Sequence, residues 1–325
     1  MMKKILLLAI TLFIALDFAG FSASENKNGG AKTTIRVGIP KAPPALPILR
    51  MIDSQAMGKD VDINFTIWDA PEKLIAMVQS SDFDMFAFPL TVVAKLYNRG
   101  VPVTLTNVNT WGVTYFMTTD PNFKNWSDLK NKTVYVPLQS SPPDVITQFF
   151  MKKAGLTPKK DVTIIYASIA EVGQMMAAGK AQYITMIEPQ VTSVLMQNKN
   201  ARVAFSFEDE WKKFTDNNTI IPNAGFGAKT KFVKENPELT KRFEQEYEKA
   251  LNWVLANPDK AASLAEEKLG LKAPVVQKAI PRMGLMYKNA YDAKADLKQF
   301  WQLLVDFDPT TIGGKVPDET LLYKK

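Results

Sequence analysis

The chain repeats one order of strand-like and helix-like segments, and this repeat limits the folds that it can adopt. Residues 35–105 and residues 133–205 each read as strand, helix, strand, helix, strand, helix and strand at nearly the same spacing. Strands that alternate with helical patterns of this length predict βαβ units, in which helices cover both faces of a sheet. The sequence therefore predicts an α/β protein with two similar halves.

Details of the two copies favour a true repeat over the alternative, a coincidental likeness between two α/β halves. Each copy has a short polar loop and a double proline after its first strand, and each third strand ends in proline. The matching residues are Pro43 and Pro44 with Pro142 and Pro143, Glu72 with Glu171, and Pro89 with Pro189. Ligands of such sheets bind outside the strand ends, so we expect two lobes that enclose a cleft, with both polar loops facing it.

The segments outside the repeat indicate how the two lobes are joined. Two stretches, near 109–116 and 217–226, carry the chain from one lobe to the other and back. Two adjacent crossings are what a hinge requires, because a few loop residues then absorb the motion of closure. We expect lobe one to comprise residues 33–112 and 224–325, and lobe two to comprise residues 113–223.

The C-terminal part of the chain is predicted to be helical and to pack on lobe one. Asn236-Pro237 and Asn257-Pro258 predict two helix starts, with asparagine as the N-cap and proline in the first turn. A further helix is expected near 293–306, and its apolar residues have the helical spacing that is typical of core packing. These residues are Leu297, Phe300, Trp301 and Leu304.

Residues 1–24 have the features of an export signal. Lys3 and Lys4 precede an apolar stretch that runs to Leu16, and small residues follow up to Ser24, where we expect cleavage. The alternative is an uncleaved membrane anchor, although the apolar stretch is shorter than the roughly 20 residues of a spanning helix. The chain has no cysteine and hence no lipid-anchor cysteine. We therefore expect a mature protein that is periplasmic and free of a lipid tether.

The missing residue types exclude several kinds of chemistry. The chain has no histidine and no cysteine, so Ser/His/Asp and Cys/His nucleophile systems and histidine metal sites cannot form. Carboxylates, lysine and tyrosine are the remaining acid/base candidates. The net charge is +7, but the basic residues are scattered among acids, so we expect no nucleic-acid partner. No cofactor, metal site or catalytic residue is predicted.

Several stretches resemble the substrate-binding proteins of ABC importers in the nitrate/sulfonate/taurine group, which share their fold with the thiamin-pyrimidine synthases. These stretches are "IRVGIPKAPPALPIL", "WSDLKNKTVYVPLQSSPPDVITQFFMKKAGLTPKKDVTIIY" and "AAGKAQYITMIEPQ", and the likeness covers about residues 33 to 305. The resemblance implies the type II periplasmic-binding fold, a small-molecule ligand and a membrane permease of an ABC transporter as partner. It also implies a monomer without enzymatic activity.

Residues at the predicted strand ends and crossings are the candidates for the ligand cleft. Lobe one contributes Lys41, Ala42, Trp68, Asp69, Pro89, Leu90 and Thr91. Lobe two contributes Gln139, Ser140, Ser141 and Glu188, and the crossings contribute Asn109, Trp111, Asn223 and Phe226.

The serines before the second double proline allow two interpretations. Ser140 and Ser141 match the loop-to-helix serines of the family, where hydroxyls and backbone N–H groups can hold an oxyanion. Serine is equally common at this position as a helix cap. Pro142 and Pro143 remove two backbone donors, and no arginine lies in the cleft loops. A strongly anionic ligand is therefore less supported than the resemblance suggests, with Lys41 as the one nearby cation.

The aromatic and acidic candidates suggest a different ligand. Trp68 and Trp111 could sandwich a flat or apolar molecule, with Asp69 accepting a hydrogen bond from it. Trp68 could equally be a core residue of its strand. Glu188 could bind an amine or fix the hinge, and the sequence does not separate these two roles.

Three classes of function fit the predicted fold. The first is a binding protein, whose ligand closes the lobes so that a transporter reads the closed shape. The second is an enzyme on the same fold, such as a pyrimidine synthase or menaquinone-pathway relative, but the synthases are known for an active-site histidine that this chain lacks. The third is a soluble sensor. We favour the binding protein.

Overall fold

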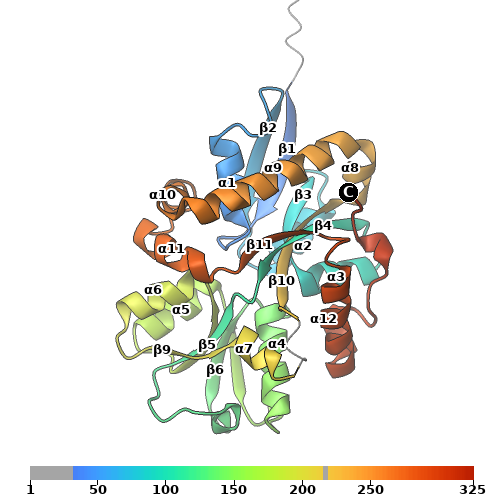
Figure 1. The fold of residues 1–325 in the computed structure, drawn as a ribbon. Coiled ribbons are helices and arrows are strands. Elements are labelled where there is room, and N and C mark those ends of the chain that lie inside the picture. The colour runs from blue at the N-terminus through green and yellow to red at the C-terminus, as the bar shows by residue number, and fades with distance from the viewer. Residues whose placement is uncertain (1–31, 215–218) are drawn as a thin grey trace, which may run out of the picture. The chain divides into compact units, whose positions relative to one another are not determined.

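The computed structural model describes residues 32–214 and 219–325, which form two β-sheets with helices packed around them (Figure 1). We call the six-stranded sheet and its helices the first lobe, and the five-stranded sheet with α4 to α7 the second lobe. The predicted export signal lies outside the described residues. Within the described ranges, no helix is both long enough and apolar enough to cross a membrane.

The first sheet has the strand order β11-β4-β10-β3-β1-β2. Its strands are β1 (Thr33–Ile39), β2 (Val61–Ile67), β3 (Met85–Pro89), β4 (Val103–Trp111), β10 (Pro222–Lys229) and β11 (Leu285–Asn289). Strand β1 is parallel to β2 and β3, whereas β10 is antiparallel to β3 and β4. The carboxyl ends of β1, β2 and β3 therefore lie at one edge of this sheet.

The second sheet has the order β7-β6-β8-β5-β9 and repeats the core of the first. Its strands are β5 (Thr114–Thr118), β6 (Thr133–Pro137), β7 (Thr163–Ala167), β8 (Tyr183–Ile187) and β9 (Arg202–Ser206). Strand β6 is parallel to β7 and β8, and β5 is antiparallel to β8. Each lobe thus has three parallel strands followed by one antiparallel crossing strand, which confirms the repeat and the predicted two-lobe α/β fold.

Helices connect the strands as the sequence predicts. In the first copy they are α1 (Ala45–Asp53), α2 (Pro71–Gln79) and α3 (Leu90–Asn98). In the second copy they are α4 (Pro142–Lys153), α5 (Ile169–Ala177) and α6 (Gln190–Gln197), followed by α7 (Phe207–Lys212). The C-terminal helices are α8 (Thr230–Glu235), α9 (Pro237–Ala256), α10 (Pro258–Leu269), α11 (Ala273–Ala279) and α12 (Lys294–Phe307).

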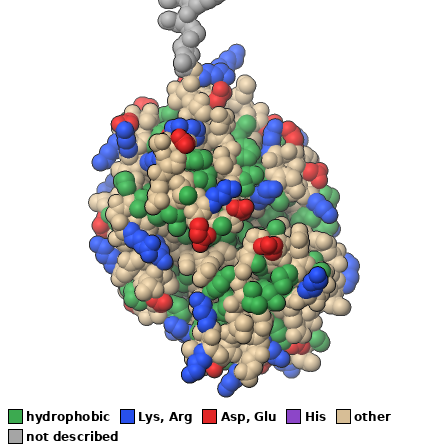
Figure 2. Space-filling model, turned by 180° about the vertical axis from the view of Figure 1, so that it is seen from behind, with side chains coloured by type: hydrophobic (Ala, Val, Ile, Leu, Met, Phe, Trp, Pro, Cys, Tyr) green, Lys and Arg blue, Asp and Glu red, His purple; other side chains and the backbone are tan. Residues whose placement is uncertain are grey.

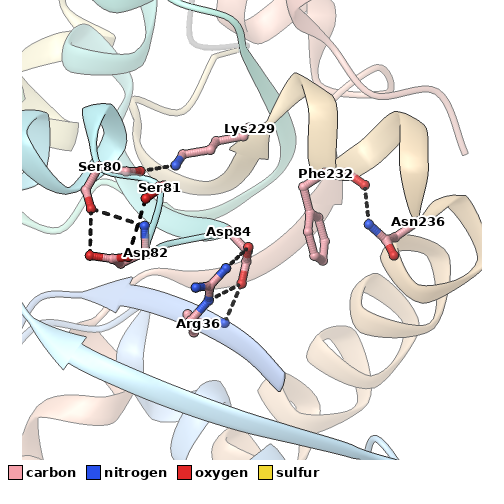
Figure 3. Close-up of polar contacts among 8 residues, drawn as sticks. All are labelled: Arg36, Ser80, Ser81, Asp82, Asp84, Lys229, Phe232 and Asn236. Atoms are coloured by element: carbon pink, nitrogen blue, oxygen red, sulfur yellow. Dashed lines mark hydrogen bonds and ion pairs between the residues drawn. The ribbon is translucent and has the colours of Figure 1, made fainter. Parts of the chain in front are cut away.

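Helices α9 and α10 begin at the predicted prolines, but the predicted role of the preceding asparagines is wrong. The Asn236 side chain makes no cap hydrogen bond to α9. Its Nδ2 instead donates to the Phe232 carbonyl at 3.1 Å, at the end of α8 (Figure 3). Asn257 Nδ2 likewise donates to the Trp253 carbonyl of α9 at 3.0 Å. These amides therefore satisfy the last carbonyls of the preceding helix rather than the first N–H groups of the next.

The sequence predicted that α12 packs on lobe one, and the helix contacts that lobe and also the second lobe. Its Trp301 Nε1 donates to the Leu90 carbonyl of α3 at 3.1 Å. The Phe300 ring lies 6.0 Å from that of Trp211 on α7, and the Phe307 ring lies 5.5 Å from that of Phe149 on α4. Helix α12 therefore packs against helices of both lobes.

A polar cluster ties three segments of the first sheet together, away from the carboxyl ends of its parallel strands (Figure 3). Asp84, just before β3, accepts from the Arg36 backbone N at 2.9 Å, from Nε at 3.1 Å and from a terminal guanidinium nitrogen at 3.0 Å. The Lys229 ammonium of β10 donates to the Ser80 carbonyl. This two-pronged arginine–carboxylate contact fixes β1 against β3.

Charged side chains are interspersed on the face shown in Figure 2, with Asp and Glu among the Lys and Arg residues. Seven of the fourteen ion pairs that the structure records between described residues join neighbours on one helix or loop, such as Lys249 with Glu246 at 2.7 Å. This distribution agrees with the interpretation of the basic residues as solvated helix faces.

Candidate ligand-binding site

A cavity of about 50 Å³ lies at the carboxyl ends of the parallel strands and takes its walls from both lobes. One water needs roughly 10–15 Å³ by this kind of measure, so the cavity holds several water-sized groups. Its lining residues are Pro40, Ala42, Pro43, Pro44, Trp68, Ala87, Phe88, Pro89, Thr110, Val113, Leu138, Ser141, Pro142, Pro143, Ile169, Ile187, Asn223 and Ala224. Both double prolines of the repeat thus meet at one cavity.

The lining is apolar and carries no charge. Six of these eighteen described residues are prolines, and none of the eighteen is Lys, Arg, Asp or Glu. The polar side chains are those of Thr110, Ser141 and Asn223, together with the indole N–H of Trp68. Such a lining, apolar with a few polar groups, is usual for a small-molecule pocket.

Three polar atoms in the lining have no hydrogen-bond partner among the described residues. They are Trp68 Nε1, Ser141 Oγ and Asn223 Oδ1, and the three side chains are at most 5% exposed. Trp68 follows β2, Ser141 precedes α4, and Asn223 lies on the crossing strand β10. Because an unpaired buried polar group costs about 1–3 kcal/mol, a molecule in the cavity that bonds to these three atoms would be stabilised by them.

Ser141 occupies the N-cap position of α4 but does not act as a cap. Its side chain makes no cap hydrogen bond, whereas Ser168, at the corresponding position before α5, accepts from the Glu171 backbone N at 3.2 Å. The two interpretations of this serine are therefore no longer equal, since the hydroxyl is left unpaired at the cavity. Whether Ser141 binds a ligand stays a prediction.

The N-terminus of α4 offers no free backbone donor for an anion. Its first two residues are Pro142 and Pro143, which have no N–H group. The Ser141 N–H donates to the Leu138 carbonyl, and the N–H groups of Asp144 and Val145 donate to the Ser141 carbonyl. These backbone donors are therefore used within the turn itself.

A carboxylate of the chain already occupies this helix N-terminus. Asp144, which is 2% exposed, accepts from the Ser140 backbone N at 2.8 Å, from Gln148 Nε2 at 2.7 Å and from the Tyr166 hydroxyl at 3.0 Å. Burial and this carboxylate raise the pKa of Tyr166, so its phenol remains a donor. The favourable end of the helix dipole is thus used by Asp144.

Five of the fifteen predicted site residues line the cavity. They are Ala42, Trp68, Pro89, Ser141 and Asn223. Two others, Thr91 and Ser140, form a direct contact between the lobes, because Thr91 Oγ1 donates to the Ser140 carbonyl at 3.0 Å. The polar loops of both lobes therefore meet here, as the repeat predicted.

Four predicted residues lie near the cavity in sequence but do not line it. Lys41, Asp69 and Gln139 are exposed, and Asp69 lies 3.7 Å from the Lys73 ammonium. Leu90 is buried and its carbonyl accepts from Trp301. The predicted cation of the cleft, Lys41, is therefore not part of the cavity wall.

The predicted sandwich of two tryptophans is not formed. Trp111 Nε1 donates to the Met286 carbonyl of β11 at 2.8 Å, and Trp111 is not among the residues that line the cavity. Phe226 is likewise a core residue, with its ring 5.0 Å from Tyr247 and 5.7 Å from Phe243. The two residues belong to different core clusters, since Trp111 lies with Trp68 and Phe116, and Phe226 lies with Phe243 and Tyr247.

Glu188 holds the two lobes together instead of facing the cavity. It is fully buried at the end of β8, and its Oε1 accepts from Arg282 Nε at 2.7 Å. Its other partner is Thr192, through the backbone N at 3.0 Å and the hydroxyl at 3.1 Å. Arg282 belongs to the C-terminal region next to α11. Of the two roles predicted for Glu188, this geometry favours fixing the lobes over binding an amine.

The two crossings are bonded to each other. The Gly112 N–H donates to the Ile221 carbonyl at 2.9 Å, and the Ile221 N–H donates to Glu208 Oε2 at 3.1 Å. Gly112 has a φ of +55°, and a Cβ there would lie 2.9 Å from that same oxygen, so this position favours glycine. Burial raises the pKa of Glu208. Residues 217 and 218 of the predicted hinge lie outside the described residues.

A chain of hydrogen bonds runs from the cavity into the first lobe. Thr110, in the lining, donates to Asn109 Oδ1 at 2.9 Å, and Asn109 Nδ2 donates to Asn107 Oδ1 at 2.9 Å. Asn107 Nδ2 then donates to the fully buried Glu244 at 2.8 Å. Burial raises the pKa of Glu244, although hydrogen bonds from Asn107 and Tyr287 oppose this effect. Asn109 therefore supports the cavity wall from behind.

Sequence reasoning missed most of the apolar wall. Thr110, Val113, Ile169 and Ile187 line the cavity, yet each looks like an ordinary strand or helix residue in the sequence. The matched positions in the repeat could have indicated Ile187, because it lies two positions before Pro189, as Ala87 of the lining lies two positions before Pro89. In the described residues, no group of three or more acidic side chains is placed to hold a metal ion.

The two lobes and the cavity between them have the fold of the two-lobe periplasmic binding proteins. A model of the NMT1/THI5-like family matches residues 55–261, so the chain belongs to this family. No curated protein matches the chain.

Solved structures of similar fold agree with this class. The periplasmic aliphatic sulphonate binding protein SsuA from Escherichia coli has a TM-score of 0.73 at 15% identity, covering 90% of this chain and 93% of that chain. The periplasmic nitrate-binding protein NrtA from Synechocystis PCC 6803 has a TM-score of 0.71 at 14% identity, covering 89% and 87%. An ABC transporter protein from Parabacteroides distasonis has a TM-score of 0.74 at 21% identity, covering 90% and 100%.

Proposed function

We propose that the protein is an exported solute-binding protein, which captures a small organic molecule between its lobes and delivers it to the membrane permease of an ABC importer. The observation that carries this proposal is the set of unpaired atoms on both lobes, Trp68 Nε1 and Ser141 Oγ, around one cavity. A molecule that bonds to both favours the closed arrangement over the open one. The protein would act as a monomer in the periplasm.

The lining supports binding rather than chemistry. Without histidine or cysteine, an enzyme on this fold would depend on carboxylates, lysine or tyrosine. Among the described residues, no Asp, Glu, Lys or Tyr lines the cavity. The alternative of an enzyme therefore has no acid or base at the place where a ligand fits.

Native mass spectrometry of the protein, purified gently from the exported fraction, tests this proposal. We expect a bound small molecule that is lost on denaturation. A matched variant, Ala224→Phe, fills the cavity from β10 and should carry no such molecule, whereas Ser168→Ala should carry it as the wild type does. An empty wild-type protein would contradict the proposal, as would a molecule retained equally by Ala224→Phe.

A further inference from the structure

The unpaired atoms around the cavity describe the chemistry of the molecule that would satisfy them. Trp68 Nε1 is a donor only, so its partner must be an acceptor. Ser141 Oγ can donate or accept. Asn223 is bonded at Nδ2 to the Thr114 hydroxyl at 3.1 Å, and this hydroxyl can also donate, so the amide can turn either end to the cavity.

Nothing in the cavity wall compensates a charge. The eighteen described lining residues include no cation, and the exposed Lys41 lies outside them. At the N-terminus of α4, two prolines have removed N–H donors, and the Asp144 carboxylate accepts from the Ser140 backbone N. An anion placed here would lose its water without a cationic partner.

We infer that the cavity takes an uncharged, largely apolar small molecule with at least one hydrogen-bond acceptor, which bridges Trp68 on one lobe, Ser141 on the other and Asn223 on the crossing strand. Carboxamides, sulfonamides and neutral nitrogen heterocycles have this chemistry. The inference rests on the proposed function, because it names the ligand class of the same cavity.

This ligand class differs from those of the similar proteins named above. Nitrate and sulfonates are anions, and they are the ligands in the names of the Synechocystis and Escherichia coli proteins. A shared fold does not fix the ligand, because the ligand contacts a small set of side chains that vary on one scaffold. In this chain the double prolines leave no N–H donor at the first two positions of α4, and no lining residue is a cation.

Matched pairs of a neutral and an anionic probe test the inference. The pairs are methanesulfonamide with methanesulfonate and benzamide with benzoate, in which shape is kept and charge is changed. We expect the neutral member of at least one pair to bind at least about 100-fold more tightly by isothermal titration calorimetry. The anions should bind the wild-type protein no more tightly than they bind the cavity-filling Ala224→Phe variant.

Two serine variants separate binding from folding. Ser141→Ala should lower the affinity for the neutral probe by about 3- to 10-fold. It should not lower the melting temperature, because the hydroxyl has no partner among the described residues. Ser168→Ala should lower the melting temperature, because this serine caps α5, and should leave probe affinity unchanged. Trp68→Phe, which keeps an aromatic ring and removes the N–H, should lower the affinity for the probe by about tenfold.

Each outcome decides the inference. Tighter binding of an anion, weakened by Ser141→Ala, would overturn the inference and leave the proposed function in place. The molecule released in the native mass spectrometry experiment decides in the same way, since a neutral molecule supports the inference and an anion overturns it. If no molecule is released and none of the four probes binds, the inference and the proposed function both fail.

Discussion

Ser141 and Ser168 stand in the same place before their helices, yet their hydroxyls do different things. Ser168 forms a reciprocal capping box with Glu171, whereas Ser141 leaves its hydroxyl unpaired beside the cavity. The sequence could place both serines at helix starts, because serine before a proline or an acidic residue is a common start signal. It could not tell which hydroxyl is used, since that depends on the backbone of the preceding loop, where Leu138 and Ser140 both have positive φ.

Glu244 supplies a prediction about pH at the scale of one residue. Burial raises its pKa above the ordinary value of 4.5, so the folded protein keeps this proton at pH values where the unfolded chain releases it. The free energy of unfolding therefore falls as pH rises from about 4.5 through the higher pKa of the folded state. Glu244→Gln should remove this loss, because the amide oxygen can still accept from Asn107 and Tyr287.

Urea unfolding at pH 4 and pH 8 measures this effect. We expect Glu244→Gln to be more stable than the wild type at pH 8 and to differ less from it at pH 4. Glu248→Gln on the same helix is the control, because the Glu248 side chain is 43% exposed, whereas Glu244 is fully buried. A lower stability of Glu244→Gln at pH 8 would show that the carboxylate is stabilised by its donors despite burial.

Among the elements, the regular strands and helices of the repeat were predictable because their patterns are local. Apolar segments of strand length alternate with amphipathic helices, and prolines mark the starts of α2, α4, α9 and α10. The roles of Asn236 and Asn257 were not predictable in this way. A side chain between two helices can bond to either, and here each amide donates to the helix before it.

The contact between Arg36 and Asp84 supplies a prediction at the scale of elements. Asp84→Ala should lower the free energy of unfolding by about 1–3 kcal/mol, because the Arg36 backbone N–H and guanidinium lose their acceptor. Ligand affinity should be unchanged, because this cluster lies away from the carboxyl ends of the parallel strands. Asp82→Ala is the control, because Asp82 is an exposed neighbour. Equal destabilisation of both variants would contradict a stabilising contact between Arg36 and Asp84.

At the scale of the whole molecule, the two lobes were predictable but the contacts between them were not. The repeat identifies two halves, and the polar loops do meet through Thr91 and Ser140. The packing of α12 on both lobes and the partner of Glu188 depend on residues more than 90 positions apart in the sequence. Five predicted residues line the cavity, while Trp111 and Phe226 are core residues because neighbouring elements cover their strands.

The pair of Glu188 and Arg282 supplies a prediction about the joined lobes. Arg282→Met should destabilise the protein by about 1–3 kcal/mol, because it leaves the buried carboxylate without its cation. Adding Glu188→Gln should recover part of this loss, since an amide costs less to bury than an unpaired charge. Denaturant unfolding of both single variants and the double variant measures the coupling. Strictly additive losses would contradict the pair as a link between the lobes.

A crystal structure of the protein with the molecule that it carries from the exported fraction tests the central claim most directly. We predict one uncharged molecule in the cavity, within hydrogen-bond distance of Trp68 Nε1, Ser141 Oγ and the Asn223 side chain. A bound anion paired with Lys41, or a closed cavity in which waters alone satisfy these three side chains, would contradict it.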